Sequence, residues 1–572
     1  MRYDVGRFRR PMRRSTEGQL VSLIALGDGS TLTLDFTTGI LDSRLTFTRL
    51  STATFINSSG FVEQANVNLF RNTVWTSTTL PSGWLENPSN TGTIVYNGDG
   101  TISCSATSET AWIFPSFPYV PTVVGLSYIC SVRVVSISGS AVAAAIVSSG
   151  NMTQLEYFVD GVSVSSSTPI TGPCVISVRG IAPSTQWFPR LGAGVQGVNV
   201  TFDVVMSEPH THPGYFPLPY RANTSTSVPN YNAPRFDYDP STRAPKGLLI
   251  EGENANLLNW SESFLASGGT NNNWADTSIT RTTGQADPAN GTTAIRFTAS
   301  AGNATVISSA AIGTSAERTF SVWLRRVSGT GDIQYTQNNG TNWTTQAITS
   351  TWTRYSFTHT VNHQVGIRIV TSGDVIEIWG AQLETGRNSS SYIPTGASQV
   401  TRSRDQVALT NLSSINFSQT EGTCLATVEV REKADSTFLP YGSFDTSGGG
   451  RCWWWLRHNL STVSGTRLLG RAFDSGGSGV LTTANYVYNS GNGGVVKFAT
   501  SLDTAASSMV FVISGGAPQT TTAAAFTLAT AAQWGLNTST DTVATALGSM
   551  WVQSFKYWPT ALPSAQLQSL TL

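Results

Sequence analysis

The sequence of 572 residues carries little charge of either sign. Lys, Arg, Asp and Glu together make up 12% of the residues, half of the roughly 25% that is usual in globular proteins. The 34 basic residues balance the 34 acidic residues, so the formal net charge is zero. Because phosphate binding requires clustered positive charge, we expect no nucleic acid partner.

Cysteine is also scarce. The five cysteines are Cys104, Cys130, Cys174, Cys424 and Cys452. No two of them have the C-x-x-C spacing, which gives no support to a zinc or redox site. An odd number does not form a complete disulfide framework, so we expect small buried apolar side chains. A Cys104–Cys130 or Cys130–Cys174 bridge stays open as the alternative.

Long apolar runs are missing. No segment approaches the ~20 apolar residues of a membrane span, which predicts no membrane insertion. The start of the chain, Met1–Arg14, is rich in arginine, but Gln19–Leu26 is too short and interrupted for the core of a signal peptide. We therefore expect synthesis in a cytoplasm and release by cell lysis.

Strand patterns dominate what is present. Apolar and polar residues alternate in Val200–Val204, Thr319–Leu324 and Arg354–Thr358. Such runs recur between clusters of Gly, Asn, Ser and Pro, which is typical of antiparallel β-sandwiches. Helix signals are limited to Ser15–Ala25 and Pro563–Leu570. The sequence therefore predicts an all-β fold.

The chain contains an internal repeat. Each copy opens with an Asn-X-Asn-Leu motif and closes with a Glu followed by an aromatic-X-Pro motif. The openings are Asn66–Phe70 and Asn254–Leu258, and the closings are Glu208 with Tyr215–Pro217 and Glu384 with Tyr392–Pro394. Two homologous jelly-roll sandwiches in tandem, at 66–230 and 254–405, are the economical interpretation.

Several ordered blocks lie within about 35–65 and 231–405. They are Leu45–Arg49, Ser51–Phe55, Ser58–Gly60, Pro234–Pro240, Gly247–Glu251, Asn256–Leu258, Ile378–Glu384, Ser391–Thr395 and Val400–Arg402. Together they resemble a module common in phage tail and head fibre proteins. In such proteins the first block runs almost directly into Pro-Arg-Phe-Asp-Tyr-Asp, so the first sandwich looks like an inserted duplicate. Such modules more often carry Arg-Thr where this chain has Asn254-Ala255.

The last part of the chain, 409–572, shows a second resemblance. Thr423–Val430 near its start, and Ser549–Pro559 with Leu562–Leu567 at its end, combine a strand, a proline turn and a short closing helix. This region is similar to concanavalin-A-like, or laminin-G-like, sandwiches. The resemblance implies a third β-sandwich at 409–572.

The two resemblances imply a structural protein on the exterior of a phage head or tail. Residues 1–30 would be a basic arm that anchors it to other virion proteins, and 31–65, continued at 231–253, a small β connecting segment. Phage fibres are commonly trimers, so we expect a homotrimer that contacts host-surface polysaccharide. Two alternatives stay open: a glycan depolymerase of a tailspike, and a virion component without a ligand.

Exposed aromatic rings are the expected sugar contacts. Trp453 and Trp455 share one face of a predicted strand, and Trp75 and Trp260 lie near the sandwich openings. We single out these four as candidate glycan-stacking residues. The alternative is that they pack in the core or close the sandwich edges.

Catalytic and metal sites have weaker support. The only acid-dense stretch contains Asp237, Asp239, Glu251 and Glu253, with basic partners nearby at Arg235, Arg243 and Lys246. We expect these groups to form ion pairs rather than a glycosidase pair, and we predict no catalytic residue. The pairs His210/His212 and His359/His363 lack an H-E-x-x-H pattern, so we expect no metal or cofactor. A structural calcium ion cannot be read from this sequence.

Overall fold

The computed structural model describes residues 28–572, apart from 108–109, 117–118, 140, 195–200, 265–273, 309–315, 362–363, 432–438, 448–449, 460–465, 484–485, 489–493 and 539–547. Most of the predicted basic arm and all of the predicted helix Ser15–Ala25 lie outside this range. Nearly all regular structure is antiparallel β-sheet, which confirms the all-β prediction. Among the described residues, no helix is long and apolar enough to cross a membrane.

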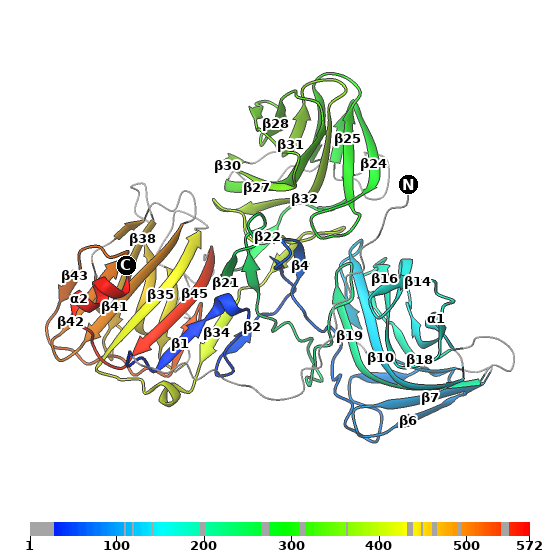
Figure 1. Ribbon diagram of the computed structural model, residues 1–572, viewed down its shortest axis with the longest axis horizontal. Helices are drawn as coiled ribbons and strands as arrows, with labels where there is room; N and C mark the ends of the chain where they lie inside the picture. Colours follow the sequence, from blue (N-terminus) through cyan, green and yellow to red (C-terminus); the bar gives the residue numbers. More distant parts are fainter. Residues whose placement is uncertain are drawn as a thin grey trace.

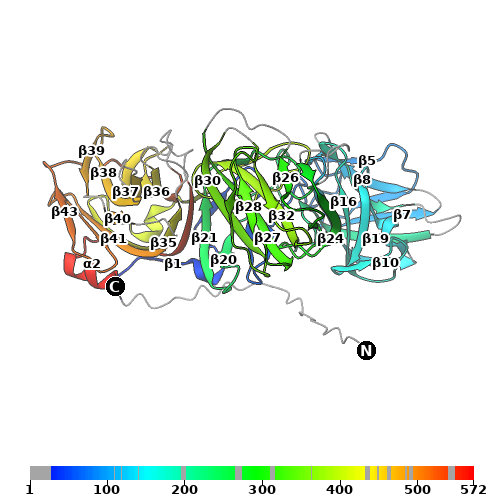
Figure 2. The ribbon, with the colours of Figure 1, turned by 90° about the horizontal axis from the view of Figure 1, so that it is seen from above.

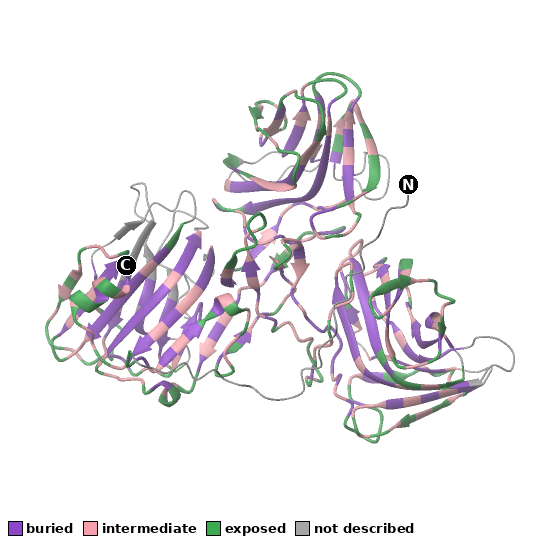
Figure 3. Cartoon of the chain, viewed as in Figure 1, coloured by how far each residue is buried: buried purple, intermediate pink, exposed green. Residues whose placement is uncertain are grey.

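Three β-rich bodies surround a short hairpin formed by β3 (Thr54–Ile56) and β4 (Val62–Gln64) (Figure 1). Seen from above, the same bodies lie in a row (Figure 2). Each body has its own large cluster of buried apolar side chains, and buried residues line the inner strands of each (Figure 3). The chain therefore folds as separate β-rich bodies, consistent with β-sandwiches in tandem.

The first sandwich pairs a seven-stranded sheet with a four-stranded sheet. The larger sheet runs β14 (Val162–Val164), β13 (Thr153–Val159), β16 (Cys174–Ile181), β10 (Ser127–Gly139), β19 (Thr201–Pro213), β7 (Ile102–Thr107), β6 (Thr93–Tyr96). The smaller sheet runs β12 (Val147–Ser148), β18 (Arg190–Ala193), β8 (Ala111–Pro115), β5 (Trp84–Glu86). Two short ladders join β11 (Ala141–Val142) to β15 (Pro169–Ile170) and β9 (Val120–Pro121) to β17 (Gln186–Trp187), with α1 (Ala143–Ile146) beside them.

The second sandwich consists of two five-stranded sheets. One runs β23 (Trp274–Thr277), β26 (Ala304–Ser308), β31 (Gly366–Ile369), β28 (Ile333–Thr336), β29 (Thr344–Thr345). The other runs β24 (Ile279–Gln285), β25 (Ala294–Ala299), β32 (Val375–Thr385), β27 (Ala316–Ser328), β30 (Thr353–Val361). A two-stranded ladder of β22 (Asn254–Asn256) and β33 (Val400–Arg402) joins the entry of this sandwich to its exit.

Hydrogen bonds confirm that the first two sandwiches repeat one another. Asn68 and Asn256 each accept, through the side-chain oxygen, the N–H two residues later and an N–H of the long closing strand. The donors are Phe70 and Thr211 for Asn68, and Leu258 and Leu383 for Asn256, all at 3.1 Å. The two asparagines therefore tie the opening of each sandwich to its last strand in the same way.

A second pair of equivalent hydrogen bonds corrects the alignment of the closing motifs. The Tyr220 hydroxyl lies 3.0 Å from that of Thr73, and the Tyr392 hydroxyl lies 2.7 Å from that of Ser261. Thr73 and Ser261 follow the aligned asparagines at the same spacing. Tyr220, and not Tyr215, is therefore the counterpart of Tyr392. Thr211 and Leu383 donate to the equivalent asparagines, so the residues that follow them, His212 and Glu384, are also equivalent. The predicted equivalence of Glu208 and Glu384 is therefore wrong.

The C-terminal sandwich has two eight-stranded sheets. One runs β20 (Phe236–Tyr238), β21 (Pro245–Glu251), β45 (Ser549–Trp558), β35 (Glu421–Arg431), β41 (Val495–Asp503), β42 (Ser508–Ile513), β43 (Gln519–Thr522), with β1 (Leu32–Asp35) also paired to β45. The other runs β2 (Thr46–Thr48), β34 (Gln406–Leu409), β44 (Gln533–Leu536), β36 (Leu439–Asp445), β37 (Arg451–Asn459), β38 (Thr466–Phe473), β39 (Gly479–Thr482), with β40 (Tyr486–Tyr488) beside β38.

This topology corrects the prediction that 31–65 and 231–253 form a small connecting segment of their own. Strands β1, β2, β20 and β21, from 31–65 and 231–253, extend the C-terminal sandwich instead of forming a sheet of their own. Leu34, Phe47 and Leu248 accordingly lie in the same core as Val428. Of the strands in 31–65 and 231–253, those of the hairpin β3–β4 form a separate two-stranded unit.

Successive side chains of β35 point to opposite faces of its sheet, and both faces are covered. Cys424, Ala426 and Val428 point into the sandwich core, whereas Leu425 belongs to a smaller cluster on the other face with Leu567. Leu567 lies on α2 (Ser564–Leu570), the predicted closing helix, which covers this face. The cysteines are all free, and all but the partly exposed Cys174 are buried, as expected for small apolar side chains.

Candidate functional site

Three of the four predicted stacking residues lie in the core. Trp453 is 1% exposed and stacks on Phe444 at 5.4 Å, and Trp455 is 0% exposed and stacks on Trp534 at 6.2 Å. Trp75 is 1% exposed. No face of these rings reaches solvent, so the prediction that they stack on sugar is wrong and the alternative, core packing, is correct. The alternation placed Trp453 and Trp455 on one face, but it is the inner face of the sheet.

Trp260, the fourth candidate, is partly buried between the first two sandwiches. Its backbone adopts a left-handed conformation, with φ of 52°, and its N–H donates to the Gly396 carbonyl at 2.7 Å. One side of its ring covers Gly125, where an added Cβ would lie 2.1 Å from the indole. This side of Trp260 therefore holds two modules together, and its role in glycan binding stays a prediction.

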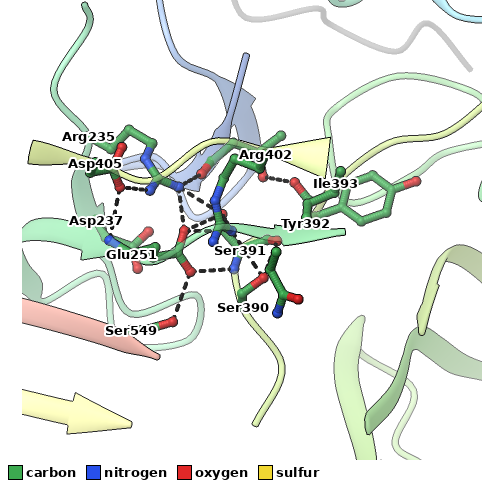
Figure 4. A network of polar contacts seen from close by, with 12 residues as sticks. Arg235, Asp237, Glu251, Ser390, Ser391, Tyr392, Ile393, Arg402, Asp405 and Ser549 are labelled. Atoms are coloured by element: carbon green, nitrogen blue, oxygen red, sulfur yellow. Dashed lines mark hydrogen bonds and ion pairs between the residues drawn. The ribbon is translucent and has the colours of Figure 1, made fainter. Parts of the chain in front are cut away.

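The acid-dense stretch is built into a buried ion-pair network (Figure 4). Glu251 pairs with Arg235 at 2.7 Å and with Arg402 at 2.9 Å. Asp405 pairs with Arg235 and, at 3.1 Å, with Arg49. The side chains of all five are essentially inaccessible to solvent. Burial raises the pKa of Glu251, but the charges of Arg402 and Arg235 outweigh it and hold the pKa well below its usual value.

The neighbouring acids also have structural partners. Asp237 accepts the Ile56 N–H at 2.6 Å and the Trp551 indole N–H at 2.7 Å, and burial raises its pKa. Asp239 caps a turn by accepting the N–H groups of Ser241 and Thr242 at 2.8 and 2.7 Å. Hydrogen bonds, rather than the expected ion pairs, therefore hold Asp237 and Asp239, and the predicted partner Lys246 pairs instead with Glu429 at 2.9 Å. Within the stretch, the ion-pair interpretation is correct for Glu251.

The histidine pairs do not form a metal site within the described residues, where no group of three His, Cys, Asp or Glu side chains is placed to hold an ion. His210 and His212 are buried on β19, and burial lowers their pKa values to about 3 and about 4. Nε2 of His210 lies 2.9 Å from the Val67 carbonyl, and Nε2 of His212 accepts the Leu218 N–H at 3.2 Å. His363 lies outside the described residues.

A cleft of about 710 Å³ opens where the hairpin β3–β4, the second sandwich and the C-terminal sandwich meet. Phe61 and the turn between β20 and β21 line one side, and Trp352, Arg354 and Ser389 of the second sandwich line another. Trp551 contributes from the C-terminal sandwich. Ligand sites in proteins commonly enclose about 300–1,000 Å³, so this cleft has the size of a binding site.

Three tryptophans line the cleft, and each is stacked on a cation. Arg354 lies 4.5 Å over Trp323, Lys246 lies 3.5 Å over Trp551, and Arg325 lies 4.8 Å over Trp352. Trp323 and Trp551 are buried, whereas Trp352 is partly exposed. Trp352 is therefore the indole of the cleft that retains surface for a ligand.

The wall of the cleft beside Trp352 is polar, and hydrogen bonds fix the position of Arg354 in it. Arg354 donates to the Ser390 carbonyl at 2.7 Å and to the Ser321 hydroxyl at 2.9 Å. Burial lowers its pKa to about 10, so the guanidinium stays charged at neutral pH. The exposed pair Ser356 and Ser389, whose hydroxyls lie 2.9 Å apart, adds hydrogen-bonding groups at the rim.

Sequence reasoning missed this cleft. Its lining comes from segments near 54–62, 237–249, 351–356, 389–392 and 551, which no local motif links. The one available signal was Trp352, which stands between Thr351 and Thr353 just before an alternating strand. An aromatic residue at a strand entrance is less constrained to the core than one inside the strand.

The chain was compared with protein-family models, curated proteins and solved structures. No protein-family model and no curated protein matches the chain. Among solved structures, the Ruminococcus gnavus IT-sialidase CBM40 bound to α2,6 sialyllactose matches with 14% identity and a TM-score of 0.22, over 27% of this chain and 85% of that chain. The tripod from the baseplate of bacteriophage Tuc2009 matches with 14% identity and a TM-score of 0.20, over 56% of this chain and 99% of that one. Similarity at this level decides neither the site nor the ligand.

Proposed function

We propose that this protein is a structural component of a bacteriophage virion, on the outside of the head or tail, that binds host-surface glycan in the cleft beside Trp352. The observation that carries the binding proposal is the cleft itself. It combines about 710 Å³ of space with a partly exposed indole and serine hydroxyls, which suit the apolar faces and the hydroxyl groups of sugar rings.

The virion assignment is supported by the sequence blocks that resemble phage fibre modules and by the low-charge, hydroxyl-rich composition. The arrangement of three β-sandwiches agrees with such a role but does not define it, because one fold serves many functions. Attachment through residues 1–30 and assembly as a homotrimer belong to the same proposal. Repetition of a weak site over many subunits would raise avidity by ~10²–10⁴.

We propose binding without cleavage. Glycoside hydrolysis requires two carboxyl groups about 5–9.5 Å apart that face the substrate. Two carboxylates of the acid-dense stretch already have structural partners: Glu251 is paired with Arg235 and Arg402, and Asp237 is bonded to Trp551. A depolymerase is the alternative, and it would need acids from another part of the surface.

A glycan array with the full chain tests the proposal. We expect the wild type to retain at least one bacterial surface polysaccharide and Trp352→Ala to bind it roughly 10–30-fold more weakly, as for an interface hot spot. Trp343→Ala is the matched control, because Arg368 lies 4.6 Å over Trp343 in a similar stack outside the cleft. No retention by the wild type, or equal losses in the two variants, would contradict the proposal.

An assay for new reducing ends on the same polysaccharide separates binding from cleavage. We expect none to form. Turnover that disappears when one acidic residue is replaced by its amide would establish the depolymerase alternative.

A further inference from the structure

A second cavity, of about 240 Å³, lies at the junction between the first two sandwiches. The segment that follows β19, with Tyr215 and Phe216, lines one side of it, and Glu262 and Tyr392 of the second sandwich line another. The hairpin β3–β4 contributes Val62. The junction is therefore incompletely packed, and a carboxyl group stands at its edge.

Glu262 joins the two modules through hydroxyl groups. Tyr215 of the first sandwich donates to Oε2 of Glu262, and Tyr392 of the second sandwich donates to Oε1 at 3.1 Å. The Thr293 hydroxyl lies 3.3 Å from Oε2 but shares its one hydrogen with Asp287, whose Oδ2 lies nearer, at 2.9 Å. Within the described part of the chain, no Lys, Arg or His forms an ion pair with Glu262.

Among the residues that the structure describes, the other direct contacts between the two sandwiches are few and uncharged. The Ala397 N–H donates to the Val124 carbonyl at 2.9 Å, and the Trp260 ring covers Gly125. A junction that rests on a few such contacts is sensitive to the loss of any one of them. Junctions of this kind commonly permit relative motion of domains.

We propose that the Tyr215–Glu262 contact is a proton-dependent latch that holds the first sandwich against the second. Burial in the closed junction disfavours the ionised carboxylate, and no ion pair within the described residues compensates; the hydrogen bonds from Tyr215 and Tyr392 offset only part of this effect. Opening the junction exposes Glu262 to water, where the ionised form is favoured. This inference does not depend on what the cleft beside Trp352 binds.

The direction of the effect follows from the groups around Glu262. Burial raises the pKa of Glu262 to about 7 from its ordinary 4.5, and Asp287 adds to the rise, whereas the hydrogen bond from Tyr215 opposes it. The other titratable groups at this place are Glu63 and His212, which line the cavity, and Arg179, which lies 5.9 Å over the Tyr215 ring. Burial lowers the pKa of His212 to about 4, so it stays neutral in the range of the test.

Because the closed state binds the proton more tightly, closure is favoured below pH 4.5 and is lost as the pH rises through about 7. Between pH 5 and pH 8.5 the closing equilibrium constant should fall on the order of 10²-fold. The change is measurable as opening of the first sandwich away from the second.

Small-angle X-ray scattering of the full chain, with light scattering to fix the oligomeric state, tests the latch between pH 5 and pH 8.5. We expect the wild type to expand reversibly as the pH rises. Glu262→Gln, which keeps the shape of the side chain and removes the charge, should stay compact throughout. Tyr215→Phe, which removes the intermodule hydrogen bond, should be more expanded than the wild type at pH 5.

Tyr220→Phe is the matched control, because the Tyr220 hydroxyl bonds to Thr73 inside the first sandwich and should leave the pH response unchanged. Two results would overturn the latch: wild-type dimensions that are the same at pH 5 and pH 8.5, or a pH response of Glu262→Gln equal to that of the wild type. If Glu262→Gln does not fold, Tyr215→Phe still decides, because dimensions identical to the wild type at pH 5 would contradict the latch.

Discussion

Replacing Glu251 by glutamine removes the shared anion from the buried network that fastens the second sandwich to the C-terminal one. In the structure Glu251 balances Arg235 and Arg402 and also accepts the Ser391 N–H at 2.8 Å and the Ser549 hydroxyl at 2.9 Å. Glu251→Gln keeps the shape but leaves both guanidinium groups without this carboxylate. Breaking a buried pair in this way costs roughly 3–5 kcal/mol.

This loss should appear in calorimetry as a lower unfolding temperature of the C-terminal sandwich, whose sheet contains Glu251 at the end of β21. At about 2–4 °C per kcal/mol for a domain of this size, we expect a decrease of about 10 °C. The control is Glu317→Gln, because Glu317 and Arg387 form a pair that is 36% exposed on both sides and should contribute no more than about 1 kcal/mol. A loss from Glu251→Gln as small as that of the control would show that the buried network does not stabilise this sandwich.

Three further outcomes follow from the structure. Because ion pairs depress the pKa of Glu251, its stabilising effect is present above pH 4.5 and lost as the pH falls; acid titration of stability should show this loss in the wild type and less of it in Glu251→Gln. Trp453→Ala should destabilise the C-terminal sandwich by roughly 3–5 kcal/mol in denaturant unfolding, and unchanged stability with lost glycan binding would contradict its placement in the core. Asn68→Ala and Asn256→Ala, which remove equivalent hydrogen bonds, should each lower the stability of their own sandwich by at least about 1–3 kcal/mol in calorimetry, and a loss in only one sandwich would contradict the repeat.

The sequence was most informative where a pattern repeats locally. Alternating strands predicted the all-β fold, and the paired Asn-X-Asn-Leu motifs identified two equivalent positions, because Asn68 and Asn256 make the same hydrogen bonds. The closing motif was misaligned because Tyr215 and Tyr220 lie close together in sequence, and only the hydrogen bond of Tyr220 to Thr73 identifies the counterpart of Tyr392.

Long-range pairing was the part that local patterns could not supply. Strand β21 pairs with β45, so that Leu249 lies opposite Trp551. No sequence pattern near Leu249 predicts this pairing. Alternation correctly placed Trp453 and Trp455 on one face, but it does not say which face of a strand meets the core. The cleft beside Trp352 depends on both kinds of information, which is why it was missed.

The most direct test of the central claim is a crystal structure of the full chain with the saccharide that the array identifies. We expect a sugar ring to lie against Trp352 in the cleft, with hydroxyl groups within hydrogen-bonding distance of Ser356 or Ser389. A saccharide bound on another surface, with the cleft empty, would contradict it.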